Sequence, residues 1–293
     1  MSSFDLRDWV GRTETREDTL RPEQVQALSA ALGRDDNLLP GTPLPPLRHW
    51  LYFIDMQPRN AVGRDGHPKL GGFLPDVAAY WGMPVRRMWA GSRVEFNAPL
   101  WLCEPVTKRS TIEDISEKHG RVGKLVFVTV RHEIFDAADR LAITDRHDIV
   151  YRPDDAPSGG AEAAPGGASV TREFNADPVL LFRYSALTWN GHRIHYDRDY
   201  ARDVEGYRGL VVHGPLLATL LADLAQDTHS LRAMKQFSFR ARRPVMDGTT
   251  FTLNGQALNG LGTSNQAASE DAMRLWVADA EGNLAMQAEA QFS

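Results

Sequence analysis

Residues 209–225 read GLVVHGPLLATLLADLA and form the longest apolar-rich stretch of the chain. Apolar side chains would lie nearly all round a helix of this sequence, which predicts a helix that is buried on every side. Pro215 suits its first turn, where a missing N–H has no intrahelical partner to lose. His213 and Asp223 interrupt the stretch, which is also too short to span a bilayer.

The chain beyond this helix is rich in predicted strands. β-branched and aromatic residues alternate with polar ones there, and DAEGN at 279–283 is a good hairpin turn. The predicted strands are Met234–Arg242, Thr249–Ala257, Met273–Ala278 and Leu284–Phe292, with Val179–Ser185 as a further strand before the helix. One buried helix followed by antiparallel strands indicates a sheet wrapped around a helix.

The N-terminal half shows a similar but weaker plan. Pro22–Leu32 is a predicted helix, residues 49–56 are ambiguous between helix and strand, and Thr13–Glu17 is interpreted as charged surface. Its predicted strands are Arg87–Phe96, Thr107–Glu117, Gly123–Phe135 and Leu141–Tyr151. The same layout twice predicts an α+β fold, a double hotdog with two antiparallel sheets that each wrap around a central helix.

A Pro-, Gly- and Ala-rich segment separates the two halves. Residues 153–169 offer little apolar surface to bury and are predicted to form a linker. The predicted domains are therefore residues 1–152 and 170–293, and each is large enough to have its own core.

Composition excludes several classes of protein. The 293 residues include 33 Lys and Arg against 38 Asp and Glu, a net charge of −5, which argues against a general nucleic-acid or polybasic membrane binder. Cys103 is the only cysteine, so an intramolecular disulfide is excluded. The first residues contain acids and no apolar core of a signal peptide, so we expect a cytoplasmic protein.

Polar residues are densest at 184–201, YSALTWNGHRIHYDRDYA. The segment supplies Asn190, His192 and His195, and HGP at 213–215 follows at the expected start of the buried helix. A helix start presents unpaired N–H groups and the positive end of the dipole, which can stabilise an oxygen that becomes negative. Gly214 would let a ligand approach these groups closely.

This segment resembles the motif of the MaoC-like hydratases and dehydratases, Y-S-x-x-[ST]-G-D-x-N-P-x-H. Further stretches resemble the branch that contains 3-methylfumaryl-CoA (mesaconyl-CoA) hydratase and the type 2 3-hydroxyacyl-thioester dehydratases. These are GGFLP at 71–75, RRMWAGSRVEF at 86–96, LVFVTVRHEI at 125–134, DIVYR at 148–152 and GLVVHGPLLATLL at 209–221. The resemblance implies a double hotdog that hydrates or dehydrates an enoyl thioester in its C-terminal half, while the N-terminal half is non-catalytic.

The resemblance also implies roles for individual residues. The motif histidine falls on His195, the expected acid and base, whose ordinary pKa lies near working pH. The motif aspartate falls on Asn190, which cannot exchange a proton but can hold a water molecule. The Gly214 N–H would polarise the thioester carbonyl. Predicted substrate contacts are Tyr184, Arg193, His213, Arg240 and Arg242, with Arg193 a candidate partner for a free carboxylate.

Three functions stay open on the sequence. The first is hydration of a branched or dicarboxylic enoyl-CoA, such as 3-methylfumaryl-CoA to citramalyl-CoA. The second is a (3R)-3-hydroxyacyl-thioester dehydratase of fatty-acid or polyketide metabolism. The third is an acyl-CoA-binding module without activity, which the loss of the motif aspartate favours. A CoA or carrier-protein thioester is the expected partner, and the protein could act as a monomer or a homodimer.

No separate cofactor is expected, because coenzyme A is part of the substrate and no nucleotide-phosphate loop is present. His192, His195 and Asp197 could be proposed as metal ligands, but the spacing lacks a further matched ligand, and we predict no metal. A basic cluster at 232–243, which includes Arg240 and Arg242, fits either the phosphates of coenzyme A or a charged sheet edge that deters aggregation.

Overall fold

In the computed structural model, all strands join into one antiparallel sheet. The structure describes residues 5–120, 123–153, 160–258 and 271–293. The sheet has ten strands in the order β1-β3-β4-β5-β2-β7-β10-β9-β8-β6. The strands are β1 Thr13–Thr19, β2 Val85–Phe96, β3 Pro105–Gly120, β4 Gly123–Phe135, β5 Leu141–Pro153, β6 Val170–Asn175, β7 Met234–Ala241, β8 Thr250–Ala257, β9 Ala272–Ala278 and β10 Leu284–Phe292.

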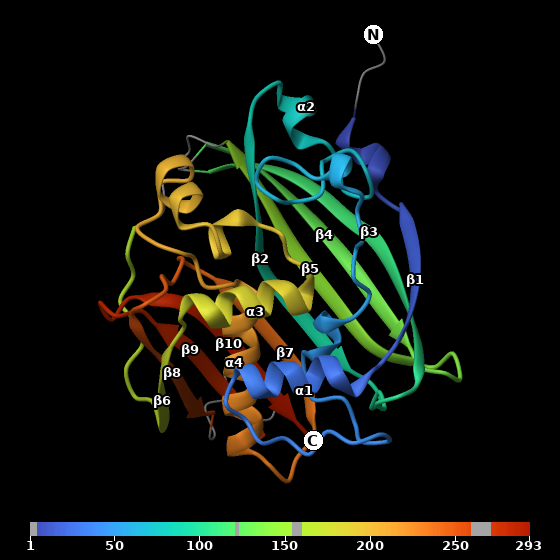
Figure 1. Ribbon diagram of the computed structural model, residues 1–293, viewed down its shortest axis with the longest axis vertical. Coiled ribbons are helices and arrows are strands. Elements are labelled where there is room, and N and C mark those ends of the chain that lie inside the picture. The colour runs from blue at the N-terminus through green and yellow to red at the C-terminus, as the bar shows by residue number, and fades with distance from the viewer. Residues whose placement is uncertain (1–4, 121–122, 154–159, 259–270) are drawn as a thin grey trace, which may run out of the picture.

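The helices lie on the inner side of this sheet (Figure 1). The α-helices are α1 Pro22–Ala31, the single-turn α2 Val77–Trp81, α3 Pro178–Thr188 and α4 Gly214–Thr228. The short turns are η1 Leu6–Trp9, η2 Arg48–Leu51, η3 Arg59–Ala61, η4 Arg193–His195 and the π-helical η5 Tyr200–Val204. None of the described helices is long and apolar enough to cross a membrane.

The α+β hotdog class is confirmed, with two differences in detail. The halves share one sheet, because β2 pairs with β7 from Gly91 opposite Arg240 to Glu95 opposite Gln236. Only the C-terminal half wraps around a long helix, since α4 packs against β7, β8, β9 and β10. In the N-terminal half the described residues place η2 and its flanking loop in the core instead, with Leu47, Leu51 and Phe53 buried.

Helix α4 begins at Gly214, within the HGP start that the sequence predicted, and the apolar residues from Gly209 onward precede it. The residues before it form strand-like contacts: Val211 bridges to Met246, and the Val212 N–H donates to the Val245 carbonyl at 2.9 Å. Pro215 occupies the first turn as expected, and the helix buries ten side chains. Asp223 is among them, and it accepts from Arg48 Nη2 at 2.8 and 3.0 Å, which neutralises its charge inside the core.

The predicted strand Val179–Ser185 is wrong, because these residues belong to α3. Asp177 caps this helix by accepting from the Leu180 N–H at 2.8 Å, and Pro178 occupies the first turn. A short apolar run does not by itself distinguish a strand from a helix, and here the capping residues decide.

The remaining expected elements agree to within a few residues, and two strands were not predicted. Thr13–Glu17, expected as charged surface, lies in β1, an edge strand of the sheet where charged side chains discourage further pairing. β6 forms the opposite edge. The hairpin turn at Asp279–Asn283 joins β9 to β10 as predicted. Part of the predicted linker, residues 154–159, lies outside the described residues.

Candidate active site

The motif residues form the turn that leads from α3 towards the start of α4. Trp189 ends α3 in the left-handed conformation with φ 54°, and the Asn190 N–H then donates to the Ser185 carbonyl at 2.8 Å. The Asn190 side-chain oxygen accepts from the His192 N–H at 3.0 Å. Asn190 therefore shapes this turn, and one of the two lone pairs of its side-chain oxygen is used in doing so.

His195 lies in η4, beside the first turn of α4. Its Nδ1 lies 2.7 Å from the Val211 carbonyl oxygen, and its ring stacks on His213 with centroids 3.7 Å apart and planes 18° apart. A carbonyl only accepts, so Nδ1 carries the proton and Nε2 is unprotonated in the neutral ring. Burial lowers the pKa of His195 to about 4, since the Val211 hydrogen bond offsets it only in part.

His213 and Gly214 bring the helix start to this ring. His213 is fully buried, and its Nε2 lies 2.9 Å from the Ser185 hydroxyl oxygen. Burial and the nearby His195 and His192 rings hold the pKa of His213 well below the ordinary value. Next to it, Gly214 has open space where a Cβ would stand. His213 therefore adjoins both groups, the imidazole of His195 through ring stacking and the start of α4 as its N-cap residue.

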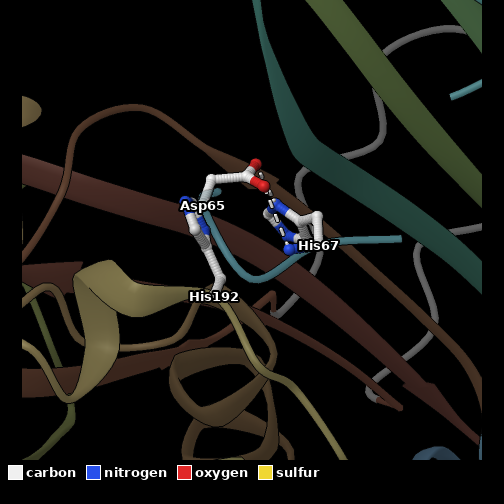
Figure 2. Close-up of side chains that lie close together, drawn as sticks. All are labelled: Asp65, His67 and His192. Carbon is white, nitrogen blue, oxygen red and sulfur yellow. Dashed lines mark hydrogen bonds and ion pairs between the residues drawn. The ribbon is translucent and has the colours of Figure 1, made fainter. Parts of the chain in front are cut away.

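A loop of the N-terminal half completes the cluster (Figure 2). His67 Nδ1 donates to Asp65 Oδ2 at 3.0 Å, and the ring of His67 lies 4.0 Å from that of His192. His192 in turn meets His195 edge-on at 5.5 Å between centroids. Four imidazoles, those of His67, His192, His195 and His213, thus form a continuous row from this loop to α4.

Glycines allow the loop to approach the motif. A Cβ on Gly66, whose φ is +90°, would overlap the Gly191 carbonyl oxygen, and a Cβ on Gly191 would lie 2.8 Å from the Gly66 oxygen. The Arg193 N–H donates to the Asp65 carbonyl at 2.9 Å. The contact between the halves at this point is made by backbone atoms, and only glycine permits it.

The charges in the cluster favour neutral imidazoles beside an ionised carboxyl. Burial opposes ionisation of Asp65, but the hydrogen bonds and charge of His67 lower its pKa to about 2. Burial lowers the pKa of His67, and Asp65 partly restores it. Burial also lowers the pKa of His192, to about 2. The charge of Arg87 lowers the pKa of both rings.

Asp65, His67 and His192 could reach a common metal ion, because one ligand atom from each lies within 4.8 Å of the others. The charge of Arg87 disfavours a cation at this place, because it already lowers the pKa of both histidines. The hydrogen bond from His67 Nδ1 to Asp65 is compatible with either arrangement, because Nε2 stays free. The absence of a metal stays a prediction.

The predicted substrate contacts are spread more widely. Tyr184 is buried with its ring 4.8 Å from that of His213, and burial raises its pKa. Arg193 pairs with Asp197 at 2.6 Å and covers the Tyr200 ring at 4.1 Å. Arg240 is exposed on β7, and Arg242 donates to Gln287 at 2.9 Å. Within the described residues, neither of the last two contacts the histidine row.

Sequence reasoning missed Asp65, His67 and Ser185. The first two stand in GRDGHPKLGG at 63–72, which reads as an ordinary loop. The available signal was an aspartate and a histidine two residues apart in a Gly-rich loop. Among the cavities of the described residues, one of about 470 Å³ beside the middle of α4 and one of about 220 Å³ near Arg198, Gly209 and Asp247 do not include the histidine row.

Comparison with known proteins identifies the family. Residues 47–247 match the model described as hydroxyacyl-thioester dehydratase type 2. The chain belongs to this family. Among its relatives, mesaconyl-C(4)-CoA hydratase of Chloroflexus aurantiacus is 44% identical to this chain over 257 residues, which are 86% of this chain and 89% of that protein. The mitochondrial hydroxyacyl-thioester dehydratase type 2 of Schizosaccharomyces pombe is 28% identical over 230 residues, 70% of this chain and 75% of that one.

Solved structures share the fold of this member of the type 2 dehydratase family. A MaoC-like dehydratase from Phytophthora capsici superposes with a TM-score of 0.65 at 15% identity, covering 98% of this chain and 97% of that one. The predicted resemblance and the hotdog class are therefore confirmed.

Proposed function

We propose that the protein is a hydro-lyase that reversibly adds water to the double bond of a 2-enoyl-CoA thioester. The observation that carries this proposal is the fixed tautomer of His195 beside the open start of α4. Two relatives named as a hydratase and a dehydratase support the same chemistry.

The reaction needs a base, an acid and a partner for the developing oxyanion. His195 Nε2 removes a proton from water as the oxygen bonds to the β-carbon and the C=C π bond breaks. The electron pair moves onto the thioester oxygen, which the Gly214 N–H stabilises by roughly 2.7–4 kcal/mol. The imidazolium then returns the proton to the α-carbon. Asn190 helps to hold the water through its amide, although its oxygen already caps the turn.

The best substrate candidate is 3-methylfumaryl-CoA, which would yield citramalyl-CoA. Its support is the 44% identity to mesaconyl-C(4)-CoA hydratase. A (3R)-3-hydroxyacyl-thioester dehydratase is the second candidate, favoured by the family description and the yeast relative. We further propose that the C-terminal half holds the acid–base residue, and that the protein acts in the cytoplasm as a monomer or homodimer without a separate cofactor.

One assay separates these candidates. The loss of enoyl-thioester absorbance is followed for 3-methylfumaryl-CoA and for a linear monocarboxylic 2-enoyl-CoA, with wild type and His195→Ala side by side. Removal of the acid–base group should lower kcat by about 100- to 10,000-fold. Binding of CoA esters without turnover by wild type would support the non-catalytic binding module instead.

A free carboxylate on the substrate needs a positive partner. Arg193 was the sequence candidate, but it is engaged by Asp197 and Tyr200, whereas the charge of Arg87 acts on His67 and His192. We therefore place the carboxylate near Arg87. Arg87→Met should raise KM for 3-methylfumaryl-CoA about tenfold, the equivalent of ~1.4 kcal/mol. KM for the monocarboxylic substrate should not change, and Arg193→Met serves as the matched control.

A further inference from the structure

The motif turn leaves the proposed reaction short of one group. Asn190 stands where the family motif has an aspartate, and its side-chain oxygen is bonded to the His192 N–H at 3.0 Å. An amide cannot exchange a proton as a carboxylate does, and one of the two lone pairs of this oxygen is already used in the turn. The motif turn therefore gives His195 no carboxylate as a second acceptor with which to orient the attacking water.

The Asp65–His67 pair supplies such an acceptor from the other half of the chain. Asp65 holds His67 by both oxygens: Oδ2 accepts from Nδ1 at 3.0 Å, and Oδ1 accepts from the His67 backbone N–H at 3.1 Å. The Nδ1 proton is thereby fixed toward the carboxylate, so Nε2 is an unprotonated acceptor. This is the arrangement by which a carboxylate selects the tautomer and orientation of a working histidine.

The location of the pair fits this role. Its loop contacts the motif through Gly66 and Gly191 and through the bond from the Arg193 N–H to the Asp65 carbonyl. The ring of His67 lies 4.0 Å from His192, the next ring in the row to His195 (Figure 2). His67 is half-buried, whereas His195 and His213 are buried, so His67 is the more accessible to a substrate.

We propose that His67, oriented by Asp65, is a second catalytic residue of this site, and that its Nε2 accepts a hydrogen bond from the attacking water. The inference rests on the proposed hydration. His195 removes one proton from the water and returns it to the α-carbon, while His67 accepts from the second O–H and aims the oxygen at the β-carbon. That second proton stays on the oxygen and becomes the hydroxyl of the product. The N-terminal half, predicted from the sequence to be non-catalytic, thus contributes to the chemistry.

The test measures kcat and KM of the full chain for 3-methylfumaryl-CoA and a monocarboxylic 2-enoyl-CoA. The variants are Asp65→Asn, His67→Ala and His67→Gln. Asp65→Asn turns the Nδ1 partner into a possible donor and so favours the wrong tautomer. We expect Asp65→Asn and His67→Ala to lower kcat about 100-fold with KM within threefold. Gln, whose side-chain oxygen can accept near the position of Nε2, should recover about tenfold over Ala.

A second Asp–His pair with the same spacing provides the matched control. Asp145 and His147 are joined at 2.8 Å inside the N-terminal sheet, and no contact of the described residues links them to the histidine row. His147→Gln should lower the melting temperature and leave kcat within twofold. All variants are compared by circular dichroism and thermal melting, so that a loss of fold is separated from a loss of chemistry.

The outcomes distinguish the two proposals. If wild type hydrates neither substrate, the proposed function fails. If wild type is active and His195→Ala is not, but Asp65→Asn and His67→Ala keep kcat within twofold, the role of His67 is refuted and the function stands. Loss of activity in EDTA with recovery on adding Zn²⁺ would make the pair metal ligands and also overturn the inference. Activity unchanged by EDTA is the expected result.

Discussion

At the scale of single residues, the tautomer of His195 is the decisive feature of the site. The Val211 carbonyl fixes the proton on Nδ1, so the ring can act only through Nε2. Stacking on His213 holds the plane of the ring at the start of α4. The same burial that orders the ring also makes its charged form costly, which lowers its pKa to about 4.

This pKa gives a prediction for the pH dependence of activity. Hydration needs neutral His195, so kcat/KM should be almost constant from pH 8 to pH 5 and fall by half near pH 4. An exposed histidine with its ordinary pKa near 6.5 would instead produce the fall near that pH. Short assays after a rapid jump to each pH, with a return to pH 7 to check reversibility, measure this profile. A midpoint above pH 6 would argue against His195 as the base.

At the scale of elements, the loop that contains Asp65 and His67 is held to the motif by backbone contacts. Gly66 lies at φ +90° against the Gly191 carbonyl, where no side chain fits. Gly66→Ala should therefore separate the loop from the motif and destabilise the protein by about 1–3 kcal/mol. Because His67 moves with the loop, kcat should fall as well.

The control for this loop is Gly72→Ala, since a Cβ at Gly72 meets no atom within 4 Å. Urea unfolding and steady-state kinetics are measured on both variants. Equal behaviour of Gly66→Ala and Gly72→Ala would show that the close approach of the two loops is not needed for stability or activity.

The connection between η2 and α4 depends on a buried ion pair. Arg48 and Asp223 are 1% and 7% exposed, and burial raises the pKa of Asp223 while the Arg48 charge opposes this. Arg48→Met leaves the buried carboxyl with only the more distant Arg34, whose Nε lies 4.0 Å from Oδ2, and should cost about 3–5 kcal/mol. Arg48→Met combined with Asp223→Leu should regain most of this loss.

Unfolding in urea gives the free energies of these variants. Arg172→Met is the control, because the side chains of Arg172 and its partner Asp227 are 45% and 34% exposed. A double variant no more stable than Arg48→Met alone would contradict the role given to the buried charge.

At the scale of the whole molecule, buried and half-buried histidines with lowered pKa values occur in both halves. His49 and His132 in the N-terminal half, and His67, His192, His195 and His213 in the candidate site, all have pKa values lowered chiefly by burial. In the unfolded chain these groups would titrate near 6.5. Below that pH the unfolded state therefore binds more protons than the folded state.

The sign of this effect predicts a loss of stability in acid. The free energy of unfolding rises with pH wherever the unfolded state holds more protons, so it should decrease as the pH falls from 7 to 5. Asp145 adds to the loss of stability only below about pH 4, where an aspartate in the unfolded chain takes up a proton and the folded Asp145, with its lowered pKa, does not. Urea midpoints at pH 8, 7, 6 and 5 test the prediction, and equal midpoints at pH 7 and 5 would contradict it.

The sequence by itself determined the parts of this protein that depend on local pattern. The buried helix, most strands, the Asp279–Asn283 turn and the family motif were all readable, because periodicity, turn chemistry and spacing are properties of neighbouring residues. The choice between strand and helix for α3 was not, since the cap at Asp177 outweighed a short apolar run.

Only the tertiary structure decided how the halves combine. The pairing of β2 with β7 and the approach of Asp65 and His67 to His192 join segments that are far apart in the chain. No local propensity encodes such contacts. They follow from which sheet edges remain unpaired and from where two glycines let two backbones meet, and both are settled by packing of the whole chain.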